Sequence, residues 1–200
     1  MVVPKNIHEA FKDLKWEKVV HEEMRALHDN GTWEVVNLLK GNKLVGSKWV
    51  FTMKYKADEE VERYKARLVA QGFTQTYGID YEETFAPVAK LNSIRVLLSL
   101  AVNLDRELHE LDVKNAFLNG TLNEEVYMKI PPGFQSEKKR GKVCKLKKSL
   151  YGLKQSPRSW FTRFSSTLTR LKYTQGQTDH IIFVKKWENG KKGHSYCIRR

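Results

Sequence analysis

One carboxylate and one aromatic side chain lie close together near the middle of the chain. Asp112 stands between Leu111 and Val113, and Phe117 follows five residues later. The apolar positions over residues 107–113 predict a strand that ends near the carboxylate. Because carboxylate oxygens are ligands that Mg²⁺ prefers, a carboxylate at a strand end could hold a divalent cation on a rigid scaffold.

Cationic side chains recur on two predicted strands, over residues 44–56 and 61–70. A short polar stretch joins the strands, so the pattern predicts a hairpin. Alternation places two cations on one face of each strand. These cations are Lys54, Lys56, Lys65 and Arg67. Four cations on one ribbon are costly unless water or an anion faces them, so solvated faces and a phosphate-binding ribbon both stay open.

Helical periodicity predicts three helices, over residues 7–29, 91–104 and 158–171. Asn6 and Glu9 have the spacing of a capping box at the start of the first helix, and Pro157 suits the first turn of the third. The positions expected to be buried in the first two helices are Phe11, Leu14, Met24, Leu27, Leu91, Ile94, Leu97, Leu98 and Ala101.

Further short strands are predicted between the helices, and no regular pattern is predicted from residue 187 onward. These strands cover residues 32–39, 124–130, 143–147 and 181–186. Strands and helices are interleaved without strict βαβ alternation. The sequence therefore predicts an α+β fold with a mostly antiparallel sheet and packed helices.

Charge is distributed unevenly along the 200 residues, which carry a formal net charge of +13. Residues 1–134 hold 18 Lys and Arg against 20 Asp and Glu, whereas residues 135–200 hold 18 against 3. A polyanionic partner would account for this excess, and a solvated basic face is the alternative. No apolar run approaches the ~18 residues that span a bilayer, so no membrane partner is expected. Two cysteines suit a reducing intracellular compartment rather than a disulfide framework.

Four blocks of residues, in order along the chain, resemble the reverse transcriptases of copia-type retrotransposons. The blocks are residues 49–56 with 64–72, 81–90, 111–134, and 143–161, the last containing Leu-Tyr-Gly-Leu-Lys-Gln-Ser-Pro-Arg. The resemblance implies the fingers and part of the palm of a right-hand polymerase fold over residues 41–186. Residues 1–40 would supply a preceding helix and strand, and residues 187–200 a divergent tail.

The resemblance also implies roles for individual residues. Asp112 matches the first metal-binding, catalytic aspartate, and the backbone of Val113 beside it matches a further metal contact. Phe117 matches the ring that lies under the incoming sugar and excludes a 2′-hydroxyl. The other implied nucleotide-binding residues are Lys65, Arg67, Tyr151 and Gly152. The implied template–primer contacts are Lys54, Lys56, Ser156, Pro157 and Arg158.

Members of this family use Mg²⁺ or Mn²⁺, deoxynucleoside triphosphates, an RNA template and a DNA primer, inside a cytoplasmic particle or the nucleus. They also carry a downstream Tyr-x-Asp-Asp motif. The 200 residues contain no Asp-Asp pair, and Tyr196 is followed by Cys197 where the motif is expected. Because two-metal phosphoryl transfer needs more than one carboxylate, we expect this chain to lack useful polymerase activity. The remaining palm, the thumb and the RNase H domain are expected to lie outside this sequence.

Three functions fit these observations. The first is the RNA-directed DNA polymerase domain of a copia-type element. The second is a catalytically inactive basic remnant that binds RNA or an RNA–DNA hybrid, whose affinity would fall steeply with salt. The third is a decayed, partly unfolded element fragment, which a cooperative melt would count against.

Overall fold

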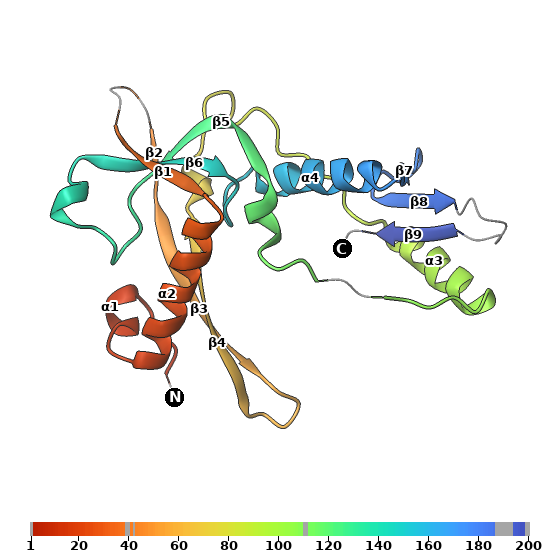
Figure 1. Cartoon of the computed structure of the whole chain (residues 1–200), viewed down its shortest axis with the longest axis horizontal. Coiled ribbons are helices and arrows are strands. Elements are labelled where there is room, and N and C mark those ends of the chain that lie inside the picture. The colour runs from red at the N-terminus through yellow and green to blue at the C-terminus, as the bar shows by residue number, and fades with distance from the viewer. Residues whose placement is uncertain (1, 39–40, 42, 110–111, 187–193, 199–200) are drawn as a thin grey trace.

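The computed structural model describes residues 2–38, 41, 43–109, 112–186 and 194–198. Two helices and six strands form one side of the molecule, and the remaining two helices and three strands form the other (Figure 1). Antiparallel pairs dominate the sheets, as predicted. No helix within these ranges has the length and apolar character needed to cross a membrane.

The first predicted helix is divided in two, α1 (Ile7–Ala10) and α2 (Leu14–Asp29). The capping box is confirmed, since the Asn6 side chain accepts a hydrogen bond of 3.0 Å from the backbone N–H of Glu9. Asp13 then accepts a bond of 2.8 Å from the backbone N–H of Lys15. Asp13 thus caps a second helix with extended backbone angles, which interrupts the helix that periodicity alone predicted.

A four-stranded sheet has the order β1-β6-β5-β2. Its strands are β1 (Trp33–Asn37), β2 (Leu44–Val45), β5 (Thr121–Met128) and β6 (Lys142–Lys148). β6 pairs antiparallel with both β1 and β5, and the short β2 joins the far edge parallel to β5.

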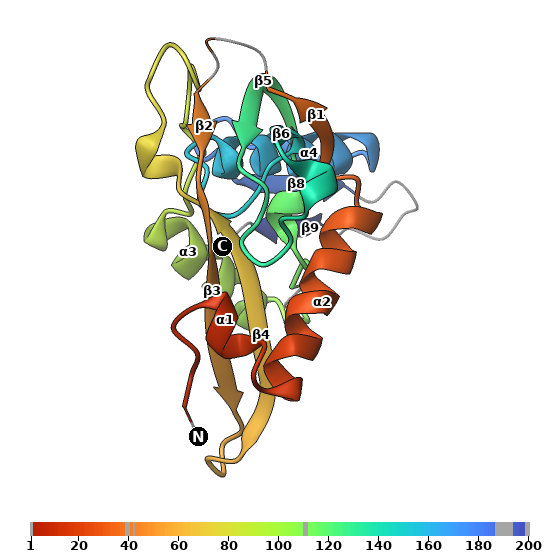
Figure 2. The same cartoon turned by 90° about the vertical axis from the view of Figure 1, so that its left-hand side faces the viewer.

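The predicted hairpin is confirmed as β3 (Ser47–Tyr55) and β4 (Val61–Ala70). Figure 2 shows α2 running alongside this ribbon. The buried Trp16 of α2 meets Phe51 and Tyr64 edge-on, with ring centroids 5.5 and 4.9 Å apart. One face of the hairpin is therefore committed to the core, and the other is left for solvent or a ligand.

The main core lies where α2, the hairpin and the four-stranded sheet meet. Its fully buried side chains include Trp16, Leu27, Leu68, Val126, Met128 and Leu150. Three short 3₁₀ turns connect these elements: η1 (Gly72–Thr74), η2 (Ala116–Asn119) and η3 (Glu137–Lys139).

The other side of the molecule holds α3 (Leu91–Asn103), α4 (Ser156–Arg170) and a three-stranded antiparallel sheet. Its strands are β7 (Thr174–Gln175), β8 (Ile182–Lys186) and β9 (His194–Ile198). The prediction of no regular structure from residue 187 onward is wrong for residues 194–198, which form β9. β8 supplies the hydrogen-bonding partner that a tail alone would lack.

The strand predicted over residues 107–113 is wrong for the part that the structure describes. Residues 107–109 and 112–113 belong to no helix or strand, and residues 110–111 lie outside the described part. None of the described strands pairs with this segment. A lone strand would leave its backbone N–H and C=O groups unpaired, so an apolar pattern by itself does not establish a strand.

Several helix positions predicted to be buried are exposed. Ala101 is buried as predicted, but Leu91 and Leu98 of α3 are 59% and 47% exposed. α3 is held by polar contacts, such as the 2.5 Å bond from the Ser93 hydroxyl to Asp179. Leu14, the first residue of α2, is 82% exposed. Periodicity gave the apolar face of each helix but not whether another element covers it.

Candidate nucleic-acid interface

The solvent-facing side of the hairpin carries cations from both strands. Residues opposite each other in an antiparallel pair share a face. Lys54 lies opposite Arg63, Thr52 opposite Lys65, and Val50 opposite Arg67. Lys54, Arg63, Lys65 and Arg67 therefore share one face, and Lys48 joins them opposite Val69. We refer to these five cations as the basic face.

Lys56 does not belong to the basic face. β3 ends at Tyr55 with an irregular register, so Lys56 lies in the turn. Its Nζ is 3.3 Å from Oε2 of Glu60, in an exposed ion pair of the kind that contributes little stability. The predicted strand was one residue too long, which is why alternation misplaced this lysine.

Like charges crowd Lys65. Partial burial lowers the pKa of its ammonium group, and the neighbouring Arg67, Arg63 and Lys54 lower the pKa further. A cation in this setting is stabilised by any anion that approaches it. The basic face therefore favours a phosphate-bearing ligand.

Three residues predicted to bind nucleotide meet on the basic face, around Arg67. The Arg67 guanidinium carbon lies 4.1 Å from the centroid of the Tyr151 ring. That ring meets Phe117 nearly edge-on, with centroids 4.7 Å apart and planes at 69°. Arg67 also has a buried Nη1 that finds no hydrogen-bond partner in the described part of the chain. We call Arg67, Tyr151 and Phe117 the aromatic–arginine cluster.

Close backbone contacts hold this cluster together. The N–H of Ala70, at the end of β4, donates to the carbonyl of Tyr151 over 2.7 Å. Gly152 has φ +92°, and a Cβ there would lie 2.1 Å from the Ala70 carbonyl oxygen. On the other side, the Ser149 hydroxyl donates to the carbonyl of Phe117. Gly152 therefore serves the site by allowing the chain to approach β4.

The residues predicted at the start of α4 have separate environments. Ser156 is buried, and its hydroxyl donates to the Leu150 carbonyl over 2.6 Å, so it closes the preceding loop. Pro157 lies in the first turn of α4, as predicted. Arg158 is half-buried and forms an ion pair of 2.9 Å with Glu83. Of these three, only Arg158 presents a charge.

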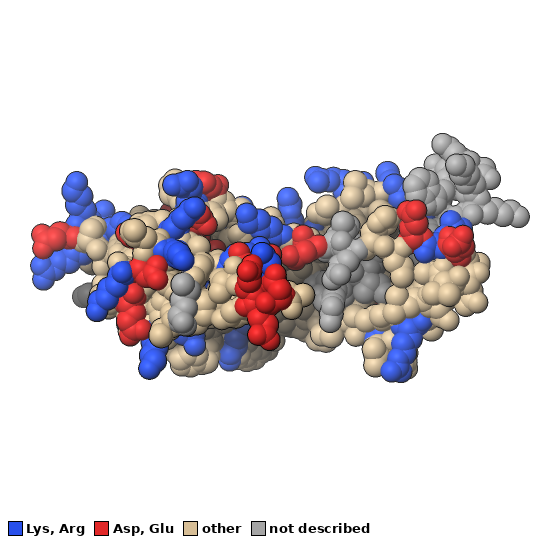
Figure 3. All heavy atoms as spheres, turned by 90° about the horizontal axis from the view of Figure 1, so that it is seen from below, with Lys and Arg blue, Asp and Glu red and all other residues tan. Residues whose placement is uncertain are grey.

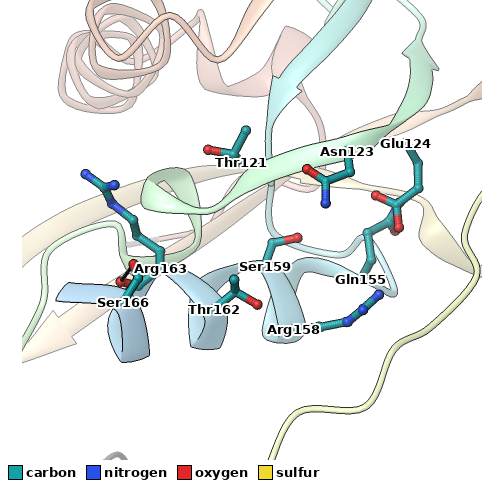
Figure 4. Close-up of a pocket in the computed structure, with 9 residues that line it drawn as sticks. All are labelled: Thr121, Asn123, Glu124, Gln155, Arg158, Ser159, Thr162, Arg163 and Ser166. Carbon is teal, nitrogen blue, oxygen red and sulfur yellow. Dashed lines mark hydrogen bonds between the residues drawn. The ribbon is translucent and has the colours of Figure 1, made fainter. Parts of the chain in front are cut away.

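A polar cleft of about 310 Å³ lies between α4 and β5 (Figure 4). Thr121, Asn123 and Glu124 line it from the β5 side. The lining residues from α4 and the residue before it are Gln155, Arg158, Ser159, Thr162, Arg163 and Ser166. Two guanidinium groups, several hydroxyls and one carboxylate thus line the cleft, a mixture suited to a polar ligand.

Asp112 and Val113 are exposed and lie outside any regular element. Among the residues that the structure describes, no group of three or more His, Cys, Asp or Glu side chains could hold a metal ion. Divalent cations such as Mg²⁺ require several oxygen ligands in a fixed geometry. The described residues therefore do not form a complete Mg²⁺ or Mn²⁺ site around Asp112.

Sequence reasoning missed several residues that shape the site. Arg63 and Lys48 could have been found by extending the alternation along both strands. Glu23 of α2 could not have been found in this way, because it meets Arg67 and the Leu68 N–H of a different element. Burial raises the pKa of its carboxyl, while Arg67 and the Leu68 N–H oppose that increase.

Charges of both signs mix across the side of the molecule containing the hairpin, whereas the end near α3 has wide uncharged areas (Figure 3).

The comparisons with known proteins agree on one family. Residues 30–192 match the family model described as reverse transcriptase (RNA-dependent DNA polymerase). The Pol polyprotein of transposon TNT 1-94 from Nicotiana tabacum is 49% identical over 85% of this chain, and that of transposon RE1 from Arabidopsis thaliana is 43% identical over 90%. The Gag-Pol polyprotein of transposon Ty1-ER2 from Saccharomyces cerevisiae is 28% identical over 78%.

The aligned region spans only 13%, 12% and 9% of these three relatives. No solved structure matches the chain.

Proposed function

The chain belongs to the reverse transcriptase family of copia-type retrotransposon Pol polyproteins, and on that premise we propose that it forms the fingers and part of the palm of an RNA-directed DNA polymerase. The partners would be an RNA template, a DNA primer and a deoxynucleoside triphosphate. One observation carries the proposal: on the basic face, the Arg67 guanidinium lies over the Tyr151 ring, which contacts Phe117.

The basic face would bind phosphates. Lys65 and Arg67 would meet the triphosphate, because Lys65 lies among like charges that an anion relieves and Arg67 shares the same face of β4. Lys54 and Arg63, which lie opposite each other further along the same face, would meet the nucleic-acid backbone. Such contacts position a ligand without reading its sequence.

The aromatic–arginine cluster would hold the sugar end of the nucleotide. The Phe117 ring would lie under the sugar and leave no room for a 2′-hydroxyl. Tyr151 contacts that ring nearly edge-on and also holds the Arg67 guanidinium over its own π face. Selection of the sugar by Phe117 and binding of the phosphates by Arg67 would thus be coupled through the Tyr151 side chain.

Mg²⁺ or Mn²⁺ is the ion that the family implies, and it would supply charge neutralisation when bound. Asp112 and the Val113 carbonyl are the ligands that this chain offers, and they do not fit a complete site by themselves. We therefore propose that these 200 residues alone bind nucleic acid and nucleotide without polymerising. This also makes binding without catalysis the second candidate function.

The test is the affinity of a fluorescent, blunt RNA–DNA hybrid, measured by anisotropy at several salt concentrations. Wild type should show a steep negative slope of log affinity against log salt. Combining Lys54→Ala with Arg63→Ala, the two cations assigned to the nucleic-acid backbone, should make that slope shallower by about 2.

Lys12→Ala with Lys18→Ala removes two exposed charges outside the basic face and is the matched control. The control should retain the wild-type slope. A flat salt dependence, no binding at about 50 mM salt, or an equal loss in both double variants would overturn the proposal.

A further inference from the structure

Residues 72–81 form a loop in which the usual burial of polar and apolar side chains is reversed. Phe73 and Tyr77 are 76% and 72% exposed. Gln75 and Asp80 in the same loop are buried, at 5% and 8% exposed. Large apolar side chains that are exposed on one loop can mark an interaction site.

Hydrogen bonds hold this loop in place. The Asp80 carboxylate accepts from the Thr76 N–H over 2.7 Å, and the Gly78 N–H donates to the Tyr81 carbonyl over 2.9 Å. The buried Gln155, beside α4, donates to the Asp80 carbonyl and accepts from the Gln75 amide, each over 3.1 Å. The rings are therefore exposed on a fixed backbone rather than on a poorly anchored one.

Two lysines flank the rings. Lys154 Nζ lies 5.0 Å from the Tyr81 ring centroid and 3.2 Å from its hydroxyl. Lys43 Nζ donates to the Thr76 hydroxyl over 3.0 Å. Tyr77 and Tyr81 meet edge-on with centroids 5.8 Å apart. The nearby Glu83 is already paired with a cation of α4. The surface thus combines aromatic faces with positive charge.

We propose that Phe73, Tyr77 and Tyr81, here called the aromatic platform, bind the unpaired bases of a single-stranded nucleic acid, with Lys43 and Lys154 at its phosphates. Rings combined with cations are the chemistry of single-strand binding without sequence preference, because every base has a face that can stack. The flanking lysines favour a polyanionic strand over an apolar protein partner. The inference rests on the proposed function, because the strand is taken to be the template overhang.

The experiment compares a blunt RNA–DNA hybrid with the same hybrid bearing a short unpaired RNA extension, using anisotropy. Wild type should bind the extended hybrid more tightly. Phe73→Ala and Tyr77→Ala should each remove about tenfold of that gain and leave blunt-hybrid affinity unchanged. Ile79→Ala is the matched control, because Ile79 is 68% exposed on the same loop but has no ring.

Conservative variants distinguish stacking from general apolar contact. Phe73→Trp should keep the gain, whereas Phe73→Leu and Tyr77→Leu should lose it. A 2-aminopurine placed in the extension should change its fluorescence with wild type and not with the Leu variants. Leu variants that behave as wild type would overturn the inference, because the gain would then not depend on stacking of bases on rings.

The remaining outcomes separate the two proposals. If wild type binds both hybrids equally, the aromatic platform is wrong and the proposed function stands. If wild type binds neither hybrid, the proposed function fails, and this inference fails with it.

Discussion

Arg67 and Tyr151 lie far apart in the sequence, yet the guanidinium of one covers the ring of the other at 4.1 Å. Arg67 comes from β4 and Tyr151 from the loop before α4. This contact joins the hairpin that carries the basic face to the loop that carries the proposed nucleotide contacts. It is also the contact whose removal tests the site most directly.

We expect a double-mutant cycle of Arg67→Ala and Tyr151→Ala to show a coupling of about 0.5–2 kcal/mol in the free energy of unfolding, the range of a cation–π pair. Urea denaturation of the four proteins measures it. Tyr151→Phe keeps the ring and should retain the coupling. Arg67→Lys should lose part of it, because an ammonium group cannot stack as a plane. Additive single variants would show that the contact has no energetic role.

Gly152→Ala should destabilise the fold by about 3 kcal/mol or more, because a positive φ and a backbone clash act together. The added Cβ would lie 2.1 Å from the Ala70 carbonyl oxygen and 2.7 Å from Val69 Cγ1. Gly141→Ala is the control: Gly141 also has a positive φ, +73°, but nothing lies within 4 Å of its added Cβ. That variant should cost only about 1 kcal/mol. Equal losses in denaturation midpoint would contradict the close approach at Gly152.

The stability of Glu23→Gln relative to wild type should depend on pH. Burial raises the pKa of Glu23 above its ordinary value of 4.5. Its contribution to stability is therefore fully present below that ordinary value and is lost as pH rises through the folded-state pKa. Gln does not titrate, so the variant should gain stability relative to wild type over this interval.

Urea denaturation between about pH 4 and pH 8 measures the Glu23 effect across the interval in which a carboxyl with a raised pKa titrates. Glu22→Gln, at an exposed neighbouring position, should show no such trend. A difference between Glu23→Gln and wild type that does not change with pH would show that burial does not shift this carboxyl.

Primer extension on an RNA template, with Mg²⁺ or Mn²⁺, should give no product from the 200-residue chain. The physical reason is that Asp112 is exposed and no cluster of acidic or other metal-binding side chains surrounds it in the described part. Asp112→Ala, run beside wild type, is the control. Product from wild type that disappears in this variant would show that a working site assembles around Asp112.

Local sequence signals predicted the elements whose stabilising contacts are themselves local. The Asn6 and Glu9 capping box, Pro157 in the first turn of α4 and the β3–β4 hairpin all follow from neighbouring residues. The same applies to the placement of Lys65 and Arg67 on one face. The capping function of Asp13 is also a local signal, but helical periodicity obscured it.

The wrong predictions share a dependence on distant partners. Residues 107–113 have an apolar pattern but no described strand to pair with, whereas β9 has β8. Leu91 and Leu98 lie on helix α3 where periodicity put them, yet they are exposed. Neither hydrogen-bond partners nor covering elements can be read from a local window.

The sequence by itself determined the family, the basic excess, the hairpin and the identity of most candidate residues, because alternation, capping and motif spacing are properties of neighbouring residues. Only the tertiary structure decided that Arg67, Tyr151 and Phe117 touch, that Ser156 is buried, and that Phe73 and Tyr77 are exposed. Those outcomes depend on how β4, η2 and the loop before α4 approach one another, and that approach is set by packing and hydrogen bonds between segments distant in the chain.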